Sequence, residues 1–270
     1  MPDERGNASI LQSNHSMRSL IPSISRSIRA LALPVLFLGL LSATHAAEEP
    51  VQSPLPVNFF KNLQTAKRET VVVYGTSLSH TAAWPQALKG YFDQRFPGKV
   101  EVINSAQSGQ QSNWGLANLQ ERVLSKKPDL VFIEFSMNDS ATKHQIPVEQ
   151  AVKNLDAMVK ALREQNPQVD IVLQTMNPAW DSPAEPPERA SAKARPHLAD
   201  YYESYRGYAR EHGLPLVDHY PNWLKLQQEH EEQFKKWIPD GTHPIPEASL
   251  AVTWTAIEAL LEKARNAAAK

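Results

Sequence analysis

The sequence predicts a three-layer α/β/α domain with about five parallel strands. Short apolar segments rich in β-branched residues alternate along the chain with longer segments of helical pattern. Parallel strands need crossover helices, and helices on both faces of the sheet make such strands almost continuously apolar. The segments with this strand character are 71–74, 100–103, 130–135, 169–175 and 214–217. The alternation therefore predicts one sheet with helices on both faces.

The predicted helices fall between these strands, and the first of them shows the pattern most clearly. Its apolar side chains share one helical face and are Trp84, Leu88, Tyr91, Phe92 and Phe96. Further helical segments are predicted at 116–123, 148–162, 199–211 and 250–261. No predicted strand is followed by a G-x-G-x-x-G or Walker-type loop, so no nucleotide cofactor is expected.

Composition and charge exclude several classes of function. The chain has 270 residues, of which 41% are hydrophobic and 21% charged, with a formal net charge of -1. This corresponds to one globular domain, or to one domain with a tail. A near-neutral chain without a basic stripe is not expected to bind nucleic acid. No cysteine is present, which excludes a disulfide, a thiolate nucleophile and a zinc–thiolate site. The histidines lack metal-ligand spacing, so no metal site is expected.

The N-terminal region has the three parts of a secretory signal. Arginines precede an apolar run at 30–41, and small residues follow at 42–47. We expect 1–47 to be a signal peptide that is cleaved after Ala46 or Ala47, with export to the periplasm or the extracellular space. The apolar run is too short to span a bilayer comfortably, so no stable membrane insertion is expected after cleavage.

The remaining boundaries follow from this interpretation. Met17 would give a signal of more typical length, so the sequence before it is interpreted as an over-extended start. A proline-containing linker is expected at 48–62. A single domain is then expected at 63–270, and the oligomeric state is left open.

Ser77 is the first candidate functional residue. A buried strand ends at Gly75, and Ser77 follows two residues later, before the first predicted helix. Open α/β sheets bind ligands at this place, outside the carboxyl ends of their strands. A lone serine in such a position is more often a turn or capping residue, so the rest of the chain has to decide.

Four other residues join Ser77 at strand ends or in a terminal loop. Gly109 follows the second strand, Asn138 follows the third, and Asp240 and His243 precede the last helix. Each has a simpler explanation when taken alone. Gly109 can supply a backbone angle, Asn138 can cap a helix, and Asp240 and His243 can belong to a surface turn.

Together these residues fit acyl transfer from an ester. That reaction needs a nucleophile, a base, a group that orients the base, and donors for the oxyanion. Ser77 can supply the hydroxyl, His243 the imidazole, and Asp240 the partner of the far ring nitrogen. The candidate oxyanion donors are the backbone N–H groups of Ser77 and Gly109 and the side-chain amide of Asn138.

With these residues in this order, the chain resembles the SGNH (GDSL-like) hydrolases. Gly75-Thr76-Ser77-Leu78 is similar to the first block of that family, and Gly109 stands where the glycine of the second block lies. Asn138-Asp139 resembles the third block, and Asp240-Gly241-Thr242-His243 resembles the last. The resemblance implies a flavodoxin-like sheet and ester hydrolysis without a cofactor.

Two positions depart from the family pattern. Thr76 replaces the usual aspartate of the first block, and Ser136 replaces the usual glycine of the third, which can shift how Asn138 is presented. The Gly-Thr-Ser-Leu variant resembles secreted bacterial branches of the family, some of which act on acetylated carbohydrates.

The sequence therefore predicts a secreted serine esterase that forms an acyl-enzyme and acts on O-acetyl groups of a small-molecule or polysaccharide substrate. A lipid or thioester hydrolase of the same family and a catalytically silent carbohydrate-binding module remain as alternatives. Trp180 lies in a polar, proline-rich segment and is the candidate for stacking on a sugar ring. Trp84 and Trp114 are interpreted as core residues, and Glu134 as a structural residue.

Overall fold

The computed structural model describes residues 54–65, 68–186 and 191–270. These residues all belong to one unit, Pro50–Lys270. The expected signal peptide at 1–47, and the first part of the expected linker, lie outside the described residues.

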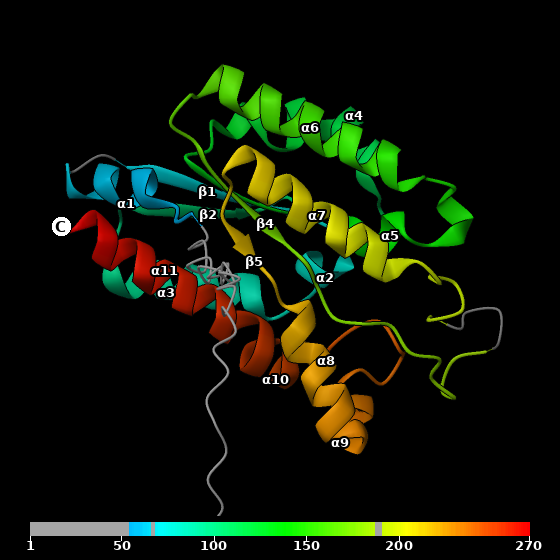
Figure 1. The fold of residues 1–270 in the computed structure, drawn as a ribbon. Helices are drawn as coiled ribbons and strands as arrows, with labels where there is room; N and C mark the ends of the chain where they lie inside the picture. Colours follow the sequence, from blue (N-terminus) through cyan, green and yellow to red (C-terminus); the bar gives the residue numbers. More distant parts are fainter. Residues whose placement is uncertain (1–53, 66–67, 187–190) are drawn as a thin grey trace, which may run out of the picture. The chain divides into compact units, whose positions relative to one another are not determined.

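The unit is built on a five-stranded parallel sheet with the strand order β2-β1-β3-β4-β5 (Figure 1). The strands are β1 (Glu69–Gly75), β2 (Val100–Asn104), β3 (Leu130–Glu134), β4 (Asp170–Gln174) and β5 (Leu216–Val217). Parallel pairing brings the carboxyl end of β1 beside that of β3, with Gly75 opposite Glu134. The predicted fold class is confirmed.

Successive residues of the central strands point into two different cores. Val72 and Ile133 belong to one buried cluster, whereas Val71, Val73 and Phe132 belong to the other. Side chains alternate between the two faces of a strand, so a sheet covered on both sides needs apolar residues at every position. This is why β1 and β3 are almost continuously apolar.

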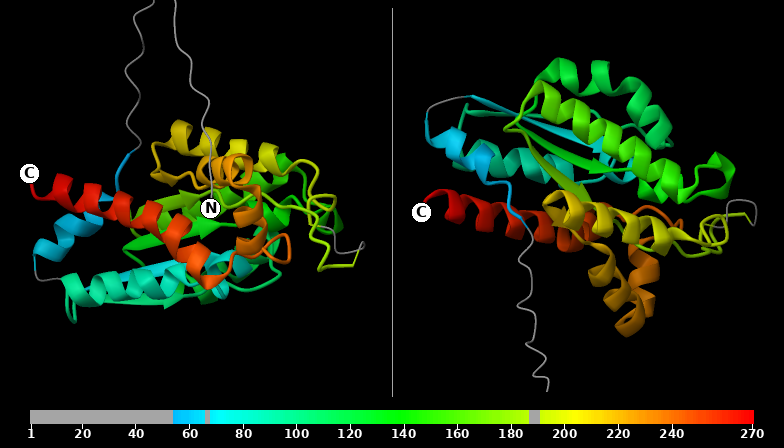
Figure 2. Two further views of the ribbon diagram at one scale, coloured as in Figure 1. Left: turned by 90° about the horizontal axis from the view of Figure 1, so that it is seen from below. Right: turned by 45° about the horizontal axis from the view of Figure 1, so that its top comes forward.

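Helices on both faces complete the three layers (Figures 1 and 2). One face is covered by α4 (Ser112–Arg122), α6 (Val148–Gln165) and α7 (Leu198–His212). The other face is covered by α1 (Val57–Gln64), α3 (Trp84–Arg95) and α11 (Thr255–Ala268). Trp84 is fully buried in the second core, and Trp114 packs against the first, as expected from the sequence.

Helix α1 corrects the expected linker at 48–62. Phe59, Phe60 and Leu63 are buried against the sheet and α3, so the described fold includes residues from Val57 onward. The start of α1 is fixed by Asp170 on β4, whose carboxylate accepts the Phe59 N–H at 2.8 Å. The sequence interpretation missed this helix because its amphipathic stretch is short and directly follows prolines.

Several shorter elements lie between the strands and the long helices. They are α2 (Ser77–His80), α5 (Ser136–Asp139), the 3-10 turns at Leu124–Lys126 and Thr142–His144, α10 (Pro246–Ala248) and a π-helical turn at Ser249–Trp254. Two helices that the sequence analysis did not predict, α8 (Tyr220–Glu229) and α9 (Glu231–Trp237), pack around Trp223 and Phe234. None of the helices in the described ranges has the length and hydropathy needed to cross a bilayer.

Candidate active site

The candidate residues meet at the carboxyl ends of the central strands. Ser77 is the first residue of α2, which begins one residue after β1, and Asn138 lies in α5, which begins one residue after β3. Gly109 lies in the loop after β2, while Asp240 and His243 lie between α9 and α10. Topology therefore brings residues from four distant parts of the chain to one edge of the sheet.

A continuous chain of hydrogen bonds joins three of these side chains. Ser77 Oγ lies 2.7 Å from His243 Nε2. On the other side of the ring, His243 Nδ1 lies 2.6 Å from Asp240 Oδ2. With the proton on Nδ1, Nε2 accepts the serine hydroxyl proton, which is the arrangement that activates a serine.

The carboxylate of Asp240 is held by its own loop. Its second oxygen, Oδ1, accepts the backbone N–H groups of Thr242 at 2.9 Å and His243 at 2.7 Å. Partial burial raises the pKa of Asp240, but hydrogen bonds from His243 and Thr242 outweigh burial and bring the pKa from 3.8 down to about 2. Asp240 is therefore ionised, and it fixes the orientation of the imidazole, at all but strongly acidic pH.

Gly241 allows this loop to close. Its φ is +80°, a left-handed conformation that favours glycine. A Cβ at this position would collide with the backbone carbonyl oxygen of Trp180. The Gly241 carbonyl accepts the Trp180 N–H at 3.0 Å, so the loop is tied to the segment that follows β4.

The turn that carries Ser77 rests on the buried carboxylate of Glu134. Glu134 accepts the backbone N–H of Thr76 at 2.6 Å and the hydroxyl of Ser79 at 2.7 Å. The Thr76 hydroxyl donates to the same carboxylate at 3.0 Å. Gly75 leaves room for this arrangement, since a Cβ there would overlap Glu134. Thr76, at the position where the family has aspartate, thus anchors the turn to β3.

Burial makes Glu134 an unusually weak acid. Removal from water raises its pKa from 4.5 to about 7, although the hydrogen bonds from Ser79 and Thr76 act in the opposite direction. The nearby charge of Asp139 adds to the increase. Glu134 therefore titrates near neutral pH directly beneath the Ser77 turn.

Two groups beside Ser77 can stabilise an oxyanion. Gly109 has a φ of +77° and lies next to the serine in the same cavity. Asn138 donates one amide hydrogen to the Gln110 carbonyl at 2.7 Å, and an amide nitrogen carries a second hydrogen. Ser77 begins α2, so its backbone N–H has no partner within that helix. These donors are fixed by the fold before any substrate binds.

The cavity above Ser77 has a volume of about 380 Å³. Its described lining residues are all polar, charged or glycine: Ser77, Thr81, Ser108, Gly109, Asn138, Lys143, Arg195, Thr242 and His243. Asp240 is absent from this lining and contacts the far side of the His243 ring. Sequence reasoning missed Lys143 and Arg195, because neither stands in a motif and only the fold brings them to Ser77.

Trp180 does not line this cavity. Its indole N–H donates to the Ile238 carbonyl at 2.7 Å, and its ring packs against the apolar cluster around Trp223 and Phe234. The Lys235 ammonium lies 5.9 Å from the ring centroid. The expected sugar-stacking role of Trp180 in this cavity is therefore wrong, because the fold packs its ring against α8 and α9. Its contacts hold the loop that carries Asp240.

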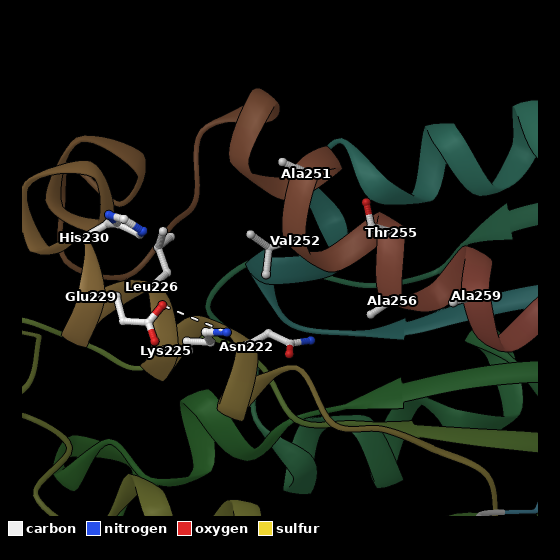
Figure 3. Close-up of a pocket in the computed structure, with 10 residues that line it drawn as sticks. All are labelled: Asn222, Lys225, Leu226, Glu229, His230, Ala251, Val252, Thr255, Ala256 and Ala259. Carbon is white, nitrogen blue, oxygen red and sulfur yellow. Dashed lines mark ion pairs between the residues drawn. The ribbon is translucent and has the colours of Figure 1, made fainter.

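A separate cavity of about 530 Å³ lies between α8 and the segment formed by the π-helical turn and α11 (Figure 3). Small apolar side chains such as Val252 and Ala256 form one wall, and an ion pair of 4.0 Å between Lys225 and Glu229 lies on the other. None of the candidate catalytic residues lines it. Within the described part of the chain, no cluster of three or more His, Asp or Glu side chains is suited to a metal ion.

A serine, a histidine and an aspartate in hydrogen-bonded sequence, at the carboxyl edge of a parallel sheet, define the class of the serine hydrolases. Comparison with known families makes the assignment more specific. The chain belongs to the GDSL-like Lipase/Acylhydrolase family, whose sequence model matches residues 71–249. The protein is accordingly a serine esterase or serine acylhydrolase.

Two relatives represent the similarity in sequence. Thioesterase 1/protease 1/lysophospholipase L1 of Escherichia coli (strain K12) is 25% identical over 193 residues, which are 68% of this chain and 80% of the relative. An arylesterase of Vibrio mimicus is 26% identical over 187 residues, which are 67% of this chain and 82% of the relative.

Among solved structures, an acetylxylan esterase from Geobacillus stearothermophilus has a similar fold. The TM-score is 0.59 at 17% identity, and the match covers 72% of this chain and 94% of the esterase. At this level of identity the likeness concerns the fold.

Proposed function

We propose that the protein is a carbohydrate O-acetyl esterase in which Ser77 is the nucleophile, His243 the general base and Asp240 the residue that orients His243. The observation that carries this proposal is the unbroken hydrogen-bond chain from Ser77 Oγ through the His243 ring to Asp240, with distances of 2.7 and 2.6 Å. No cofactor takes part in the proposed reaction.

The first half of the reaction forms an acyl-enzyme. His243 Nε2 removes the hydroxyl proton as Ser77 Oγ bonds to the carbonyl carbon, and the carbonyl oxygen becomes an oxyanion. The N–H groups of Ser77 and Gly109 and the amide of Asn138 stabilise that charge. The intermediate collapses when the ester C–O bond breaks, and His243 gives its proton to the departing alcohol.

The second half regenerates the enzyme. A water molecule replaces the alcohol and gives a proton to His243 as its oxygen attacks the acyl carbon. The same donors stabilise the second oxyanion. Collapse then breaks the bond to Ser77 Oγ, returns the proton from His243 to Ser77, and releases the carboxylic acid. Throughout both halves, the ionised Asp240 stabilises the positive charge that develops on His243.

The lining of the cavity supports a short acyl group. All its described lining residues are polar, charged or glycine. A long acyl chain gains binding energy by burial against apolar side chains, and none is among the described lining residues. The likeness of fold to an acetylxylan esterase agrees with an acetyl substrate. The relatives named as a thioesterase and an arylesterase represent the alternative of lipid, thioester or aryl ester substrates.

Export is part of the same proposal. We infer that 1–47 directs the chain to the periplasm or the extracellular space, because it combines arginines, an apolar run and small residues in the order of a secretory signal. Polysaccharide esters are present in those compartments. The Gly-Thr-Ser-Leu first block agrees with a secreted branch of the family.

The proposal is tested by the choice of substrate. Wild-type protein should release acetate from acetylated xylo-oligosaccharides and hydrolyse 4-nitrophenyl acetate, whereas 4-nitrophenyl palmitate should be a poor substrate. Ser77→Ala should abolish these activities, and Ser125→Ala, an exposed serine outside the site, should retain them. Preference for the palmitate would favour the lipid alternative. Absence of hydrolysis, together with binding of the oligosaccharides, would favour a silent binding module.

A further inference from the structure

Two cationic residues line the cavity above Ser77, and among its described lining residues there is no carboxylate. The charges belong to Lys143 and Arg195. The proposed acyl-transfer steps use neither residue, since proton transfer and oxyanion stabilisation are supplied by other groups. Because the chemical steps do not use these two cations, we ask which part of a substrate they would bind.

The two cations come from segments that the fold holds together. Lys143 belongs to the short turn at Thr142–His144, and Arg195 precedes α7. The Thr142 N–H donates to the Ala194 carbonyl at 2.9 Å, which joins the two backbones. Burial lowers the pKa of His144, and the charges of Lys143 and Arg195 lower it further, as expected when both cations lie close to the same ring.

Two segments hold the Arg195 guanidinium in place. Its Nε donates to the Met137 carbonyl at 2.9 Å, and its Nη1 donates to the Ser191 hydroxyl at 2.9 Å. Met137 directly precedes Asn138, so the guanidinium is anchored next to a proposed oxyanion donor. Among the described residues, no carboxylate forms an ion pair with Arg195, and no hydrogen bond satisfies its Nη2.

The Arg195 guanidinium is therefore available to bind an anion. Arg195 is half-buried, and a charge removed from water without an ionic partner is costly. Asp240, a carboxylate whose charge acts on the pKa of Arg195, is already engaged by His243 and Thr242. Planar guanidinium groups match the two oxygens of a carboxylate, while a flexible lysine adds a point charge.

We infer that Lys143 and Arg195 form a carboxylate-binding subsite beside Ser77, so that the preferred ester carries a carboxylate group. This inference rests on the proposed ester hydrolysis by Ser77, because it specifies the substrate class of the same site; a carboxylate on the acyl part would replace the proposed acetyl group. The carboxylate belongs either to the alcohol part, as in an acetylated acidic sugar or hydroxy acid, or to the acyl part, as in the half-ester of a dicarboxylic acid.

Matched ester pairs test the inference and separate these two sources. For the alcohol side, 4-acetoxybenzoate is compared with its neutral isostere 4-acetoxybenzamide. For the acyl side, monomethyl adipate is compared with methyl adipamate. The quantity measured is the ratio of kcat/KM for the charged ester to kcat/KM for the neutral one. This ratio is insensitive to a loss of folded enzyme, because both substrates report on the same preparation.

The variants remove one positive charge each. Lys143→Gln should lower the ratio about two- to fivefold, the effect of an exposed charge. Arg195→Gln should lower it about tenfold or more, because a half-buried guanidinium makes charge-assisted hydrogen bonds. Both effects should be mainly increases in KM for the charged ester. Lys193→Gln, which makes the same change in net charge outside the cavity, should leave the ratio unchanged. A ratio that no variant lowers in either pair would overturn the inference.

A binding measurement keeps this test independent of turnover. Titration calorimetry of the Ser77→Ala protein with each ester should show tighter binding of the charged member of one pair. That preference should weaken as salt is added, since salt screens the attraction. Equal or weaker binding of both carboxylates would overturn the subsite even if the protein is an active esterase. Tighter binding without hydrolysis by wild type would retain the subsite and contradict the proposed function.

Discussion

At the scale of single residues, the proposed mechanism requires His243 and Asp240 to act with Ser77. His243 transfers the proton in every proposed step, whereas Asp240 orients the ring and stabilises its charge. We therefore expect His243→Ala to lower kcat by about 10³-fold or more, and Asp240→Asn to lower it less. Steady-state kinetics on 4-nitrophenyl acetate measure both. His197→Ala, at an exposed histidine outside the cavity, is the control. Near-normal turnover by His243→Ala would exclude His243 as the base.

Asn138 provides a second prediction at this scale. Its amide is expected to bond more strongly to the oxyanion than to the ground-state carbonyl oxygen. Asn138→Ala should therefore lower kcat about 10²- to 10³-fold with a smaller change in KM, as for the loss of one oxyanion donor. An increase in KM with unchanged kcat would instead place Asn138 in substrate binding.

The sequence was most informative for residues that follow strand ends or stand in short motifs. Ser77, Asn138 and the Asp240–His243 pair are local features, and the structure brings them together. Trp180 was interpreted less well, because its indole bonds to a residue about sixty positions away in sequence. Glu134 was correctly interpreted as structural, although its partner Thr76 lies equally far away. A single sequence does not show that Thr76 rests on Glu134, or that Trp180 hydrogen-bonds to Ile238.

At the scale of elements, the loop between α9 and α10 positions both the proposed general base, His243, and the residue that orients it, Asp240. Gly241 combines a φ of +80° with close contact to the Trp180 carbonyl. We expect Gly241→Ala to shift the loop, to lower kcat, and to reduce the free energy of unfolding by about 1–3 kcal/mol.

Gly207 offers a matched control for this substitution. It lies within α7, and a Cβ there meets no atom within 4 Å. Gly207→Ala should raise stability by about 0.4–1 kcal/mol, since alanine loses less conformational entropy in a helix. Chemical denaturation and kinetics of the two variants check the prediction. Gly241→Ala with wild-type stability and turnover would show that the loop tolerates a side chain.

Elements differ in how well the sequence predicted them. All five strands and the long helices were expected, because apolar periodicity is strong when a helix or strand faces one of the two cores. Helices α1, α8 and α9 were not expected. Helix α1 is short, and α8 and α9 bury few residues each, around Trp223 and Phe234. Their formation depends on neighbours distant in sequence.

At the scale of the whole molecule, buried carboxyl groups make stability depend on pH. Burial raises the pKa of Glu134 to about 7 and those of Asp139 and Asp170 to about 6. A carboxyl group whose pKa is higher in the folded than in the unfolded protein stabilises the fold. This stabilisation is complete at pH values below the pKa of the unfolded state, near 4, and is lost as the pH rises through the pKa of the folded state. His219 acts in the opposite direction, because burial lowers its pKa from 6.5 to about 3.

The contribution of Glu134 can be isolated with Glu134→Gln, which mimics the neutral acid. The free energy of unfolding of wild type, minus that of the variant, should be larger at about pH 5 than at about pH 8, by up to roughly 3 kcal/mol. Urea denaturation at the two pH values measures this difference. The same difference at both values would mean that Glu134 does not titrate in this range.

The central claim is that Ser77 is the nucleophile, and covalent labelling tests it most directly. A fluorophosphonate probe reacts with a serine whose hydroxyl is activated by a neighbouring base. Mass spectrometry of the labelled, digested wild-type protein should locate one adduct, on the peptide that contains Ser77, and esterase activity should disappear as the adduct forms. Ser77→Ala should take up no probe, and His243→Ala should react far more slowly. An adduct on another residue, or full activity of Ser77→Ala, would contradict the account.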